Sequence, residues 1–203
     1  NLTGAITAWA DNTTLGGDGS FENNVGSGGG VSAYFTAPAW QAAAVSASMR
    51  TLPDWSLDAD PETGPSVFYY GTPIAIGGTS ASAPASAAMW SLVLQACRSS
   101  CTCNKGGATG YRLGNPAPLI YAIYAKSNPL SGAYTATGFT PTLGYSSVFY
   151  DVTYGDNQAV PASPGPAQTP IGYNSGPGYD QVTGVGAPFA GHLIQAVTGT
   201  TVP

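Results

Sequence analysis

The stretch from residue 76 to residue 90, IGGTSASAPASAAMW, places the hydroxyl of Ser80 between a Gly-Gly-Thr turn and an apolar segment that starts with small residues. Serine is common where helices begin, because its oxygen accepts N–H groups that the first turn leaves unpaired. The same place suits a nucleophile, because free backbone N–H groups beside it can stabilise an oxyanion. The stretch predicts a strand, a sharp turn and a helix, and leaves both roles of Ser80 open.

The composition is that of a globular chain with few charges. Of the 203 residues, 43% are hydrophobic, which is enough for a substantial core. Only 7% are charged, and the net charge is −5. We therefore expect no nucleic-acid or membrane partner, since both need clustered Lys and Arg. Because the chain has few possible ion pairs, it loses little Coulomb stabilisation when its carboxylates become protonated. The composition is therefore compatible with a protein that functions at low pH.

The start of the chain indicates a secretory route. It has no initiating Met and no leader-like segment, so we expect Asn1 to follow a processing cut. Asn1 in NLT and Asn12 in NTT are candidate glycosylation sites. The expected location is outside the cell or in a lysosome-like acidic compartment.

Three cysteines, Cys97, Cys101 and Cys103, lie within seven residues in CRSSCTC. Zinc is one interpretation, but three thiols without a nearby histidine fall short of four ligands. In a secreted chain, one local disulfide is favoured. The odd count then indicates a further cysteine on another polypeptide.

Hydrophobic patterning predicts both strands and helices along one domain. Strands are expected at 5–9, 31–35 and 66–76, and helices at 38–49, 83–96, 118–126 and 190–197. The helix at 83–96 is apolar nearly all round, which is typical of a core helix. Residues 127–178 are expected to be mostly loop.

A serine nucleophile needs a base, and His192 is the only histidine of the chain. It lies in a terminal amphipathic segment, where a lone histidine is more often a surface or capping residue than a catalyst. A Ser-His-Asp triad within these residues is therefore weakly supported. A carboxylate, or a base on another polypeptide, is the better proposal.

Residues 50–90 resemble the signature region of the sedolisins, the serine-carboxyl peptidases. The family pattern is Arg-x-x-Pro-Asp-Val-Ser-x-x-Ala-Asp-Pro-x-Thr-Gly, followed by Gly-Thr-Ser-x-x-x-Pro, and the chain reads RTLPDWSLDADPETG and GTSASAP. GSGGGVSAYFTAPAWQ, 26–41, resembles the family's Ser-Gly-Gly-Gly-x-Ser stretch before a Pro-x-x-Gln helix. YDVTYGDN, 150–157, and GPGYDQVTGVG, 176–186, resemble its C-terminal calcium site.

The resemblance implies an α/β, subtilisin-like fold with a mostly parallel sheet flanked by helices, incomplete without an N-terminal chain. Residues 1–203 would be the C-terminal part of a single peptidase catalytic domain, with calcium-binding loops at about 150–182. Ser80 would be the nucleophile. A substrate strand would pair along Ser27, Gly28 and Gly29, where glycines permit close backbone approach.

The resemblance also implies a set of Ca²⁺ ligands. Carbonyls, two carboxylates and water suit Ca²⁺, which takes six to eight oxygens. Asp156 matches no ligand position, so we expect a solvated loop carboxylate there. The implied ligands are the Asp151 and Asp180 carboxylates and the Val152, Gly176 and Gly178 carbonyls.

Four carboxylates crowd the loop that precedes the serine motif: Asp54, Asp58, Asp60 and Glu62. Such neighbours could tune one another's pKa for catalysis. The family pattern gives this loop no catalytic acid, so we expect these side chains to accept backbone N–H bonds in a turn.

The catalytic acids of the sedolisins all precede the Ser-Gly-Gly-Gly stretch: the Glu that accepts the serine proton, the Asp behind it and the oxyanion Asp. Asp11, Asp18 and Glu22 match none of their motifs. Either a second, N-terminal chain from the same precursor, disulfide-linked or not, supplies them, or this chain is an inactive fragment.

The expected function is acid-acting endopeptidase activity on proteins or peptides, released from a zymogen and passing through a Ser80 acyl-enzyme. One alternative is a subtilisin whose Asp and His lie upstream, although the PDWSLDADPETG loop and the calcium pattern argue against it. The other is a non-catalytic glycan- or protein-binding module rich in Tyr and Asn.

Overall fold

The computed structural model describes residues 6–11, 25–99, 113–127, 141–158 and 171–201. Asn1, Asn12, Cys101 and Cys103 lie outside these ranges, so the glycosylation sites and the cysteine pairing stay predictions. Within the described ranges, no helix is both long and apolar enough to cross a membrane. In chain order the elements are β1 Ala10–Asp11, β2 Val25–Gly26, β3 Gly30–Thr36, α1 Ala39–Val45, β4 Met49–Leu52, β5 Ser66–Tyr69, β6 Thr72–Ala75, α2 Thr79–Ser99, α3 Ala117–Ser127, α4 Tyr145–Val148, β7 Phe149–Tyr150, β8 Ala187–Pro188 and α5 Ala190–Thr198.

The strands form four separate antiparallel pairs, β1–β2, β3–β4, β5–β6 and β7–β8. No parallel pairing occurs among the described residues, so the mostly parallel sheet expected from the sequence is not formed by them. Parallel sheets are buried on both faces. In contrast, β3 buries none of its residues and every residue of β6 is exposed.

The segment 66–76 is a hairpin rather than one long strand. Its strands β5 and β6 pair from Ser66 with Ala75 to Tyr69 with Thr72. Tyr70 and Gly71 at the turn both have positive φ, 48° and 79°. This is the backbone that a two-residue type I′ turn requires. The strand expected at 5–9 is likewise wrong for its described residues, since β1 begins only at Ala10.

Helix α1 ends earlier than the sequence predicts. It starts after Pro38, whose fixed φ suits a helix start, and stops at Val45 because Ser46 adopts a left-handed conformation with φ 54°. Met49, expected in this helix, instead begins β4. The helices expected at 118–126 and 190–197 are confirmed to within one residue at each end by α3 and α5.

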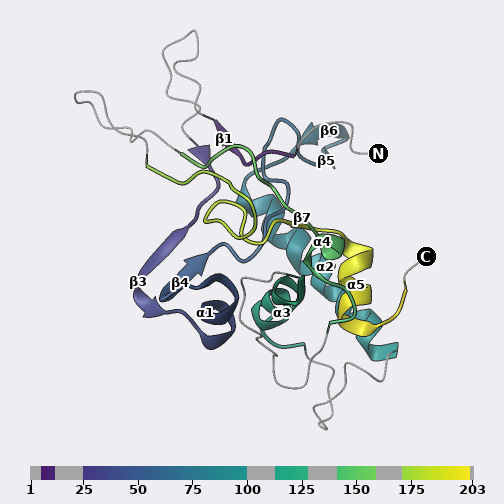
Figure 1. The fold of residues 1–203 in the computed structure, drawn as a ribbon. Coiled ribbons are helices and arrows are strands. Elements are labelled where there is room, and N and C mark those ends of the chain that lie inside the picture. The colour runs from purple at the N-terminus through teal and green to yellow at the C-terminus, as the bar shows by residue number, and fades with distance from the viewer. Residues whose placement is uncertain (1–5, 12–24, 100–112, 128–140, 159–170, 202–203) are drawn as a thin grey trace, which may run out of the picture.

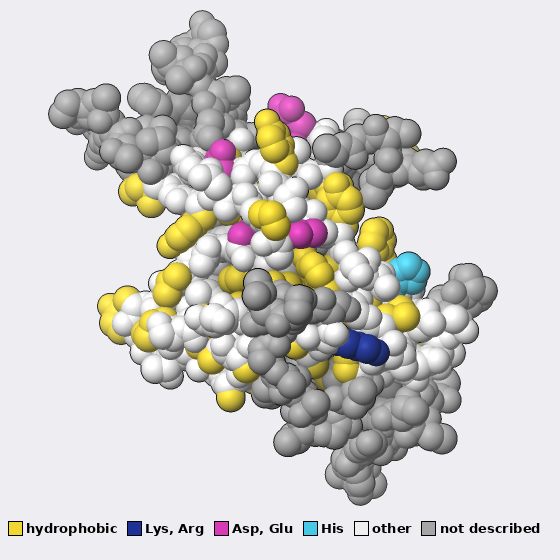
Figure 2. Space-filling model, in the orientation of Figure 1, with side chains coloured by type: hydrophobic (Ala, Val, Ile, Leu, Met, Phe, Trp, Pro, Cys, Tyr) yellow, Lys and Arg dark blue, Asp and Glu magenta, His cyan; other side chains and the backbone are white. Residues whose placement is uncertain are grey.

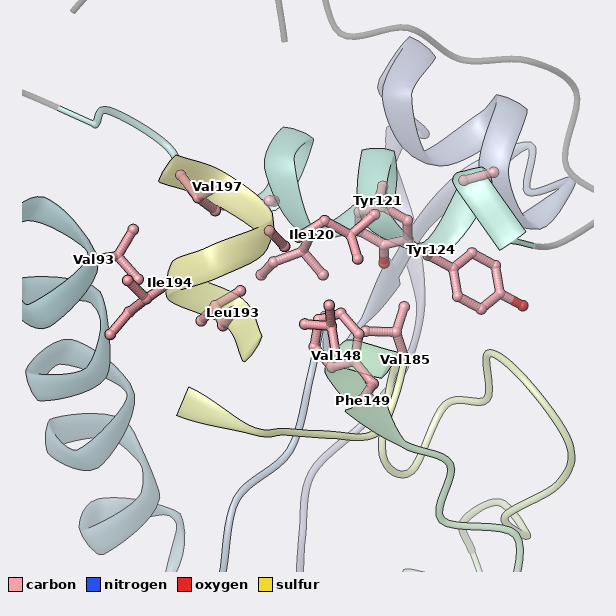
Figure 3. Close-up of a cluster of buried hydrophobic side chains, with 14 of the residues drawn as sticks. Val93, Ile120, Tyr121, Tyr124, Val148, Phe149, Val185, Leu193, Ile194 and Val197 are labelled. Atoms are coloured by element: carbon pink, nitrogen blue, oxygen red, sulfur yellow. The ribbon is translucent and has the colours of Figure 1, made fainter. Parts of the chain in front are cut away.

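The core lies where α3, α4, α5 and one side of α2 meet (Figure 1). Figure 3 shows Val93 of α2 facing Ile194 of α5, with Leu193 beside them. Val93 and Leu193 are completely buried. Tyr121 and Phe149 belong to the same cluster and join α3 to β7.

Helix α2 is not the fully buried core helix expected from its composition. Among its described side chains only Val93 and Cys97 are buried, and Leu92 is 49% exposed. The described residues cover one side of α2, chiefly with α5. Leu92 and the small apolar residues near it are therefore exposed on the other side of this helix. On the face of the molecule drawn in Figure 2, hydrophobic side chains are more frequent than charged ones.

Candidate active site

A tight turn places Ser80 as the second residue of helix α2. Gly78, just before the helix, has φ +77°, a value that favours glycine. Its N–H donates to the carbonyl of Ala59 over 2.6 Å, and its own carbonyl accepts from the N–H of Ala81 over 2.9 Å. The segment thus forms a strand, a turn and a helix in the predicted order, with the turn fixed against the acid-rich loop, but α2 begins at Thr79, four residues before the expected start.

The Ser80 side chain is exposed, and no described residue hydrogen-bonds its hydroxyl. Its backbone N–H likewise donates to no described group, as expected in the first turn of a helix. The hydroxyl therefore does not cap α2. An accessible hydroxyl beside a free N–H is the pair that nucleophilic attack and oxyanion stabilisation need.

Ser82, two residues further, is bound to the protein. Its hydroxyl donates to the carbonyl of Asp58 over 2.6 Å and lies 3.3 Å from the carbonyl of Leu57. The two serines of the motif thus differ: Ser82 ties the helix to the loop, while the hydroxyl of Ser80 has no partner among the residues that the structure describes. The sequence did not predict this difference in contacts. It distinguishes Ser80 from Ser82 only by the Gly-Thr that precedes Ser80.

The carboxylates of the acid-rich loop make structural contacts. Asp60 accepts the N–H of Glu62 over 2.8 Å, in the turn contact expected from the sequence. Asp58 lies 3.5 Å from the Thr63 hydroxyl. None of these groups hydrogen-bonds Ser80, so no base is provided by this loop.

Asp54 is paired with Arg50 at 2.7 Å. Burial lowers the pKa of Arg50, but the hydrogen bond and the charge of Asp54, together with smaller contributions from Tyr121, outweigh it, so this pKa is raised. The guanidinium also lies 5.2 Å from the centre of the Trp40 ring. This pair therefore fixes the start of the loop to α1.

His192 is an exposed residue of α5. Its Nδ1 lies 2.6 Å from the carbonyl oxygen of Ser147, and its ring packs edge-on against Phe189. A carbonyl can only accept, so Nδ1 carries a hydrogen. Among the described residues no bond joins His192 to Ser80, in agreement with its expected surface role.

The two carboxylates proposed for calcium come together from separate loops. Asp151 Oδ2 accepts the N–H of Gly178 over 2.8 Å, and Asp180 Oδ2 accepts the N–H of Gly176 over 3.0 Å. Asp180 Oδ1 also accepts the N–H groups of Val182 and Thr183. Each carboxylate thus binds the backbone of the 176–183 loop, which brings residues 27 positions apart into one place.

The second oxygen of Asp151 is buried without a hydrogen-bond partner. Burial, then the charge and close approach of the Asp151 carboxylate, and to a smaller extent the charges of Tyr124 and Asp180, raise the pKa of Tyr145 well above its usual range, although the Tyr145 hydroxyl makes no hydrogen bond of normal geometry. The hydroxyl of Tyr145 therefore lies near both carboxylates, a neighbour that the sequence did not indicate. The carbonyls of Val152, Gly176 and Gly178 accept no hydrogen bond from described residues.

These oxygens fit a hard cation. A buried, unpartnered carboxylate oxygen and three unused carbonyls are the donor types that Ca²⁺ takes. Asp156, which matches no ligand position, accepts the N–H of Gln158 over 2.9 Å within its own loop. No cluster of three or more His, Cys, Asp or Glu was found among the described residues, so such a site depends on backbone carbonyls.

The glycines before β3 differ in whether there is space for a side chain. A Cβ at Gly29 would overlap the carbonyl of Gln181, so this glycine allows close packing within the chain. A Cβ at Gly28 would meet nothing within 4 Å. The N–H of Ser27 donates to the carbonyl of Trp9 over 3.1 Å. Of the three predicted substrate-binding residues, only Gly28 therefore lies in open space with its backbone unpaired among described residues.

The fold and this site define a class: a chain of helices and strands with an accessible serine at a helix start and a paired-carboxylate loop site. Comparison of sequences finds similarity to kumamolisin of Bacillus sp. (strain MN-32), 32% identical over 178 residues, covering 84% of this chain and 25% of kumamolisin. Sedolisin of Pseudomonas sp. (strain 101) is 30% identical over 161 residues, covering 79% of this chain and 21% of sedolisin. Xanthomonalisin of Xanthomonas sp. (strain T-22) is 27% identical over 82% of this chain.

Comparison of structures gives the same result. A solved structure of Pseudomonas sedolisin, a serine-carboxyl proteinase complexed with two molecules of pseudo-iodotyrostatin, matches 91% of this chain and 39% of that chain, with a TM-score of 0.59 and 27% identity. No protein-family model matches. Over most of its own length the chain is thus similar to serine-carboxyl peptidases of the sedolisin type, and the structural likeness supports an α/β fold. It spans a quarter or less of the length of the sequence relatives named above.

Proposed function

We propose that this chain is the nucleophile-bearing part of a serine-carboxyl endopeptidase of the sedolisin type, with the subtilisin-like fold and an acidic pH optimum. The observation that carries the proposal is that the hydroxyl and N–H of Ser80, at the start of α2, have no hydrogen-bond partner in the described part of the chain. They lie in the segment that resembles the family's serine motif. The substrates would be proteins or peptides.

The reaction begins when the Ser80 Oγ attacks the carbonyl carbon of a peptide bond. A Glu carboxylate accepts the hydroxyl proton, and the Ser80 N–H together with a protonated Asp stabilises the oxyanion. The Glu returns the proton to the leaving amine, and the acyl-enzyme forms. Water then attacks the ester, which releases the acid and restores the serine hydroxyl.

The acids of this mechanism belong to an upstream polypeptide. No described carboxylate hydrogen-bonds Ser80, and β3, α2 and the β5–β6 hairpin all leave apolar side chains exposed. Phe68 and Tyr34 are 80% and 89% exposed. A partner of the same precursor would cover these faces, complete the mostly parallel sheet and offer a cysteine to the third thiol.

The two-chain protein would be secreted or act in an acidic compartment, with Asn1 and Asn12 glycosylated.

Calcium would be held by Asp151, Val152, Gly176, Gly178 and Asp180. Its two charges would neutralise the two carboxylates and satisfy the buried Asp151 oxygen. The ion would thereby hold the 150–158 and 176–186 loops together. Its role is structural, and no step of the reaction passes through it.

The test is covalent labelling of the full-length protein with a serine-directed peptide aldehyde or fluorophosphonate, located by mass spectrometry. Wild type should carry the label on Ser80, whereas Ser80→Ala should carry none and should lose at least 10⁴-fold in turnover, roughly the loss known for serine nucleophiles. Absence of any adduct at every pH, with the partner polypeptide present, would instead support a binding module.

A pH–rate profile separates the sedolisin mechanism from that of a subtilisin. The oxyanion Asp must carry a proton and the Glu must be ionised, so activity should peak near the ordinary carboxyl range, around pH 4, and fall toward neutrality. A histidine base would give the opposite profile, because imidazole is neutral only above about pH 6.

A further inference from the structure

We propose that Ser82 is a positioning residue for the nucleophile: its hydroxyl holds the first turn of α2 in the rotation that presents Ser80. The inference rests on the proposed function of Ser80. It starts from the contrast between the two hydroxyls: that of Ser82 is bound to the loop at 2.6 Å, and that of Ser80 has no partner among the residues that the structure describes.

Helix geometry links the two side chains. Residues two apart are separated by about 200° around a helix, so they point to nearly opposite sides. Ser82 is half-buried and faces the carbonyls of Leu57 and Asp58, while Ser80 is exposed. As long as Ser82 stays on the loop, Ser80 must point away from it, toward solvent.

The first turn of α2 lacks one main-chain hydrogen bond. Pro84 lies inside α2 and has no N–H, so the helical bond to the carbonyl of Ser80, four residues earlier, is not made. Among described residues, Ser82 is the only one of the first eight in α2 whose side chain bonds to the loop. Its hydroxyl therefore adds a restraint where the helix lacks one.

The acceptor side of this bond is firmly placed. Ser56, just before Leu57, donates its N–H to the carbonyl of Gly186 over 3.1 Å, and Val185 donates to the carbonyl of Asp54 over 3.0 Å. A Cβ at Gly77 would overlap Pro61, so the loop and the turn are in close contact. The carbonyls that Ser82 uses are therefore part of a fixed frame and not of a free loop.

The experiment measures acylation of Ser80 in the full-length protein with its partner polypeptide. Ser82→Ala should lower kcat and the acylation rate about 10- to 100-fold, the usual result of misplacing a reacting group, with KM nearly unchanged. Ser82→Thr, which keeps the hydroxyl, should restore most of the rate. Ser91→Ala is the matched control, since the Ser91 hydroxyl bonds only within α2, to the carbonyl of Ala87 over 2.9 Å.

Unfolding midpoints of all four proteins separate positioning from stability. The proposal is overturned if Ser82→Ala acylates at the wild-type rate, if Ser82→Thr fails to rescue, or if the rate falls only as the folded fraction falls. A wild-type protein that never acylates Ser80 overturns the proposed function itself and this inference with it. A normal wild-type rate with an unaffected Ser82→Ala variant overturns only the role of Ser82.

Discussion

At the scale of single residues, Gln41 has the lowest exposure of the buried polar and charged residues in the described part of the chain. It is completely buried, and its side chain makes three hydrogen bonds. Its Nε2 donates to the carbonyl of Thr51 over 2.8 Å and to the hydroxyl of Tyr121 over 2.6 Å, while its Oε1 accepts the N–H of Thr51 over 3.0 Å. One amide thus joins α1, β4 and α3, which explains why a glutamine can be tolerated inside the core.

Gln41→Ala should destabilise the protein by about 3 kcal/mol, because the Thr51 N–H loses its side-chain acceptor, the Thr51 carbonyl keeps only the guanidinium of Arg50 as a side-chain donor, and a cavity is left. Tyr121→Phe removes only one of the bonds and should cost about 1 kcal/mol. Gln95→Ala, on the exposed side of α2, is the control and should stay within about 0.5 kcal/mol. Urea unfolding measures all three, and an equal effect of Gln41→Ala and Gln95→Ala would contradict this account.

At the scale of elements, the loops 150–158 and 171–186 have almost no regular structure and are held by polar contacts. Isolated bridges pair Asp156 with Asn174 and Asp180 with Gly184. The side chain of Asn157 accepts the N–H of Tyr173 over 2.8 Å. These loops bury three valines but contain no helix, so a bound cation that links them would add to their stability.

Calcium should raise the unfolding temperature of the wild-type protein, since a ligand that binds only the folded state adds about 2.7 kcal/mol at a concentration 100 times its Kd. Asp151→Asn should abolish most of this rise. Asp156→Asn is the matched control from the same loop and should keep it. Differential scanning calorimetry with calcium and with a chelator measures the effect. An equal calcium response in both variants would exclude the Asp151 site.

At the scale of the whole molecule, the chain is rich in tyrosine and poor in basic residues. The chain has 12 tyrosines but only five Lys and Arg. Tyr121 and Tyr179 pack with ring centres 6.1 Å apart, and Tyr124 meets Tyr145 edge-on at 4.8 Å. Burial raises the pKa of Tyr121, Tyr145 and Tyr179 above the usual 10.0.

These raised pKa values predict a loss of stability in alkali. The folded state keeps protons that the unfolded state releases, so the free energy of unfolding is unaffected well below pH 10 and falls as the pH rises above about 10. Urea unfolding from about pH 8 to about pH 11, with tyrosinate absorbance followed in parallel, should show this fall. Tyr179→Phe should make the fall shallower, and an unchanged slope would contradict the burial effect.

The sequence by itself determined the local features of this protein. The apolar patterns of α3 and α5 gave their bounds to within one residue, and the Gly-Gly-Thr-Ser motif predicted the turn before α2. Both depend on neighbours only a few positions apart, through helical periodicity and the backbone freedom of Gly78. The resemblance carried by residues 50–90 also led to the family found by comparison.

Only the tertiary structure decided which faces are covered and which distant groups meet. It separated Ser82 from Ser80, brought Asp151 to Gly178, and left Leu92 of α2 exposed. Periodicity shows that a helix or strand has an apolar face, but not what packs against it. That depends on contacts between segments far apart in the chain, whose formation follows from the packing of the whole molecule.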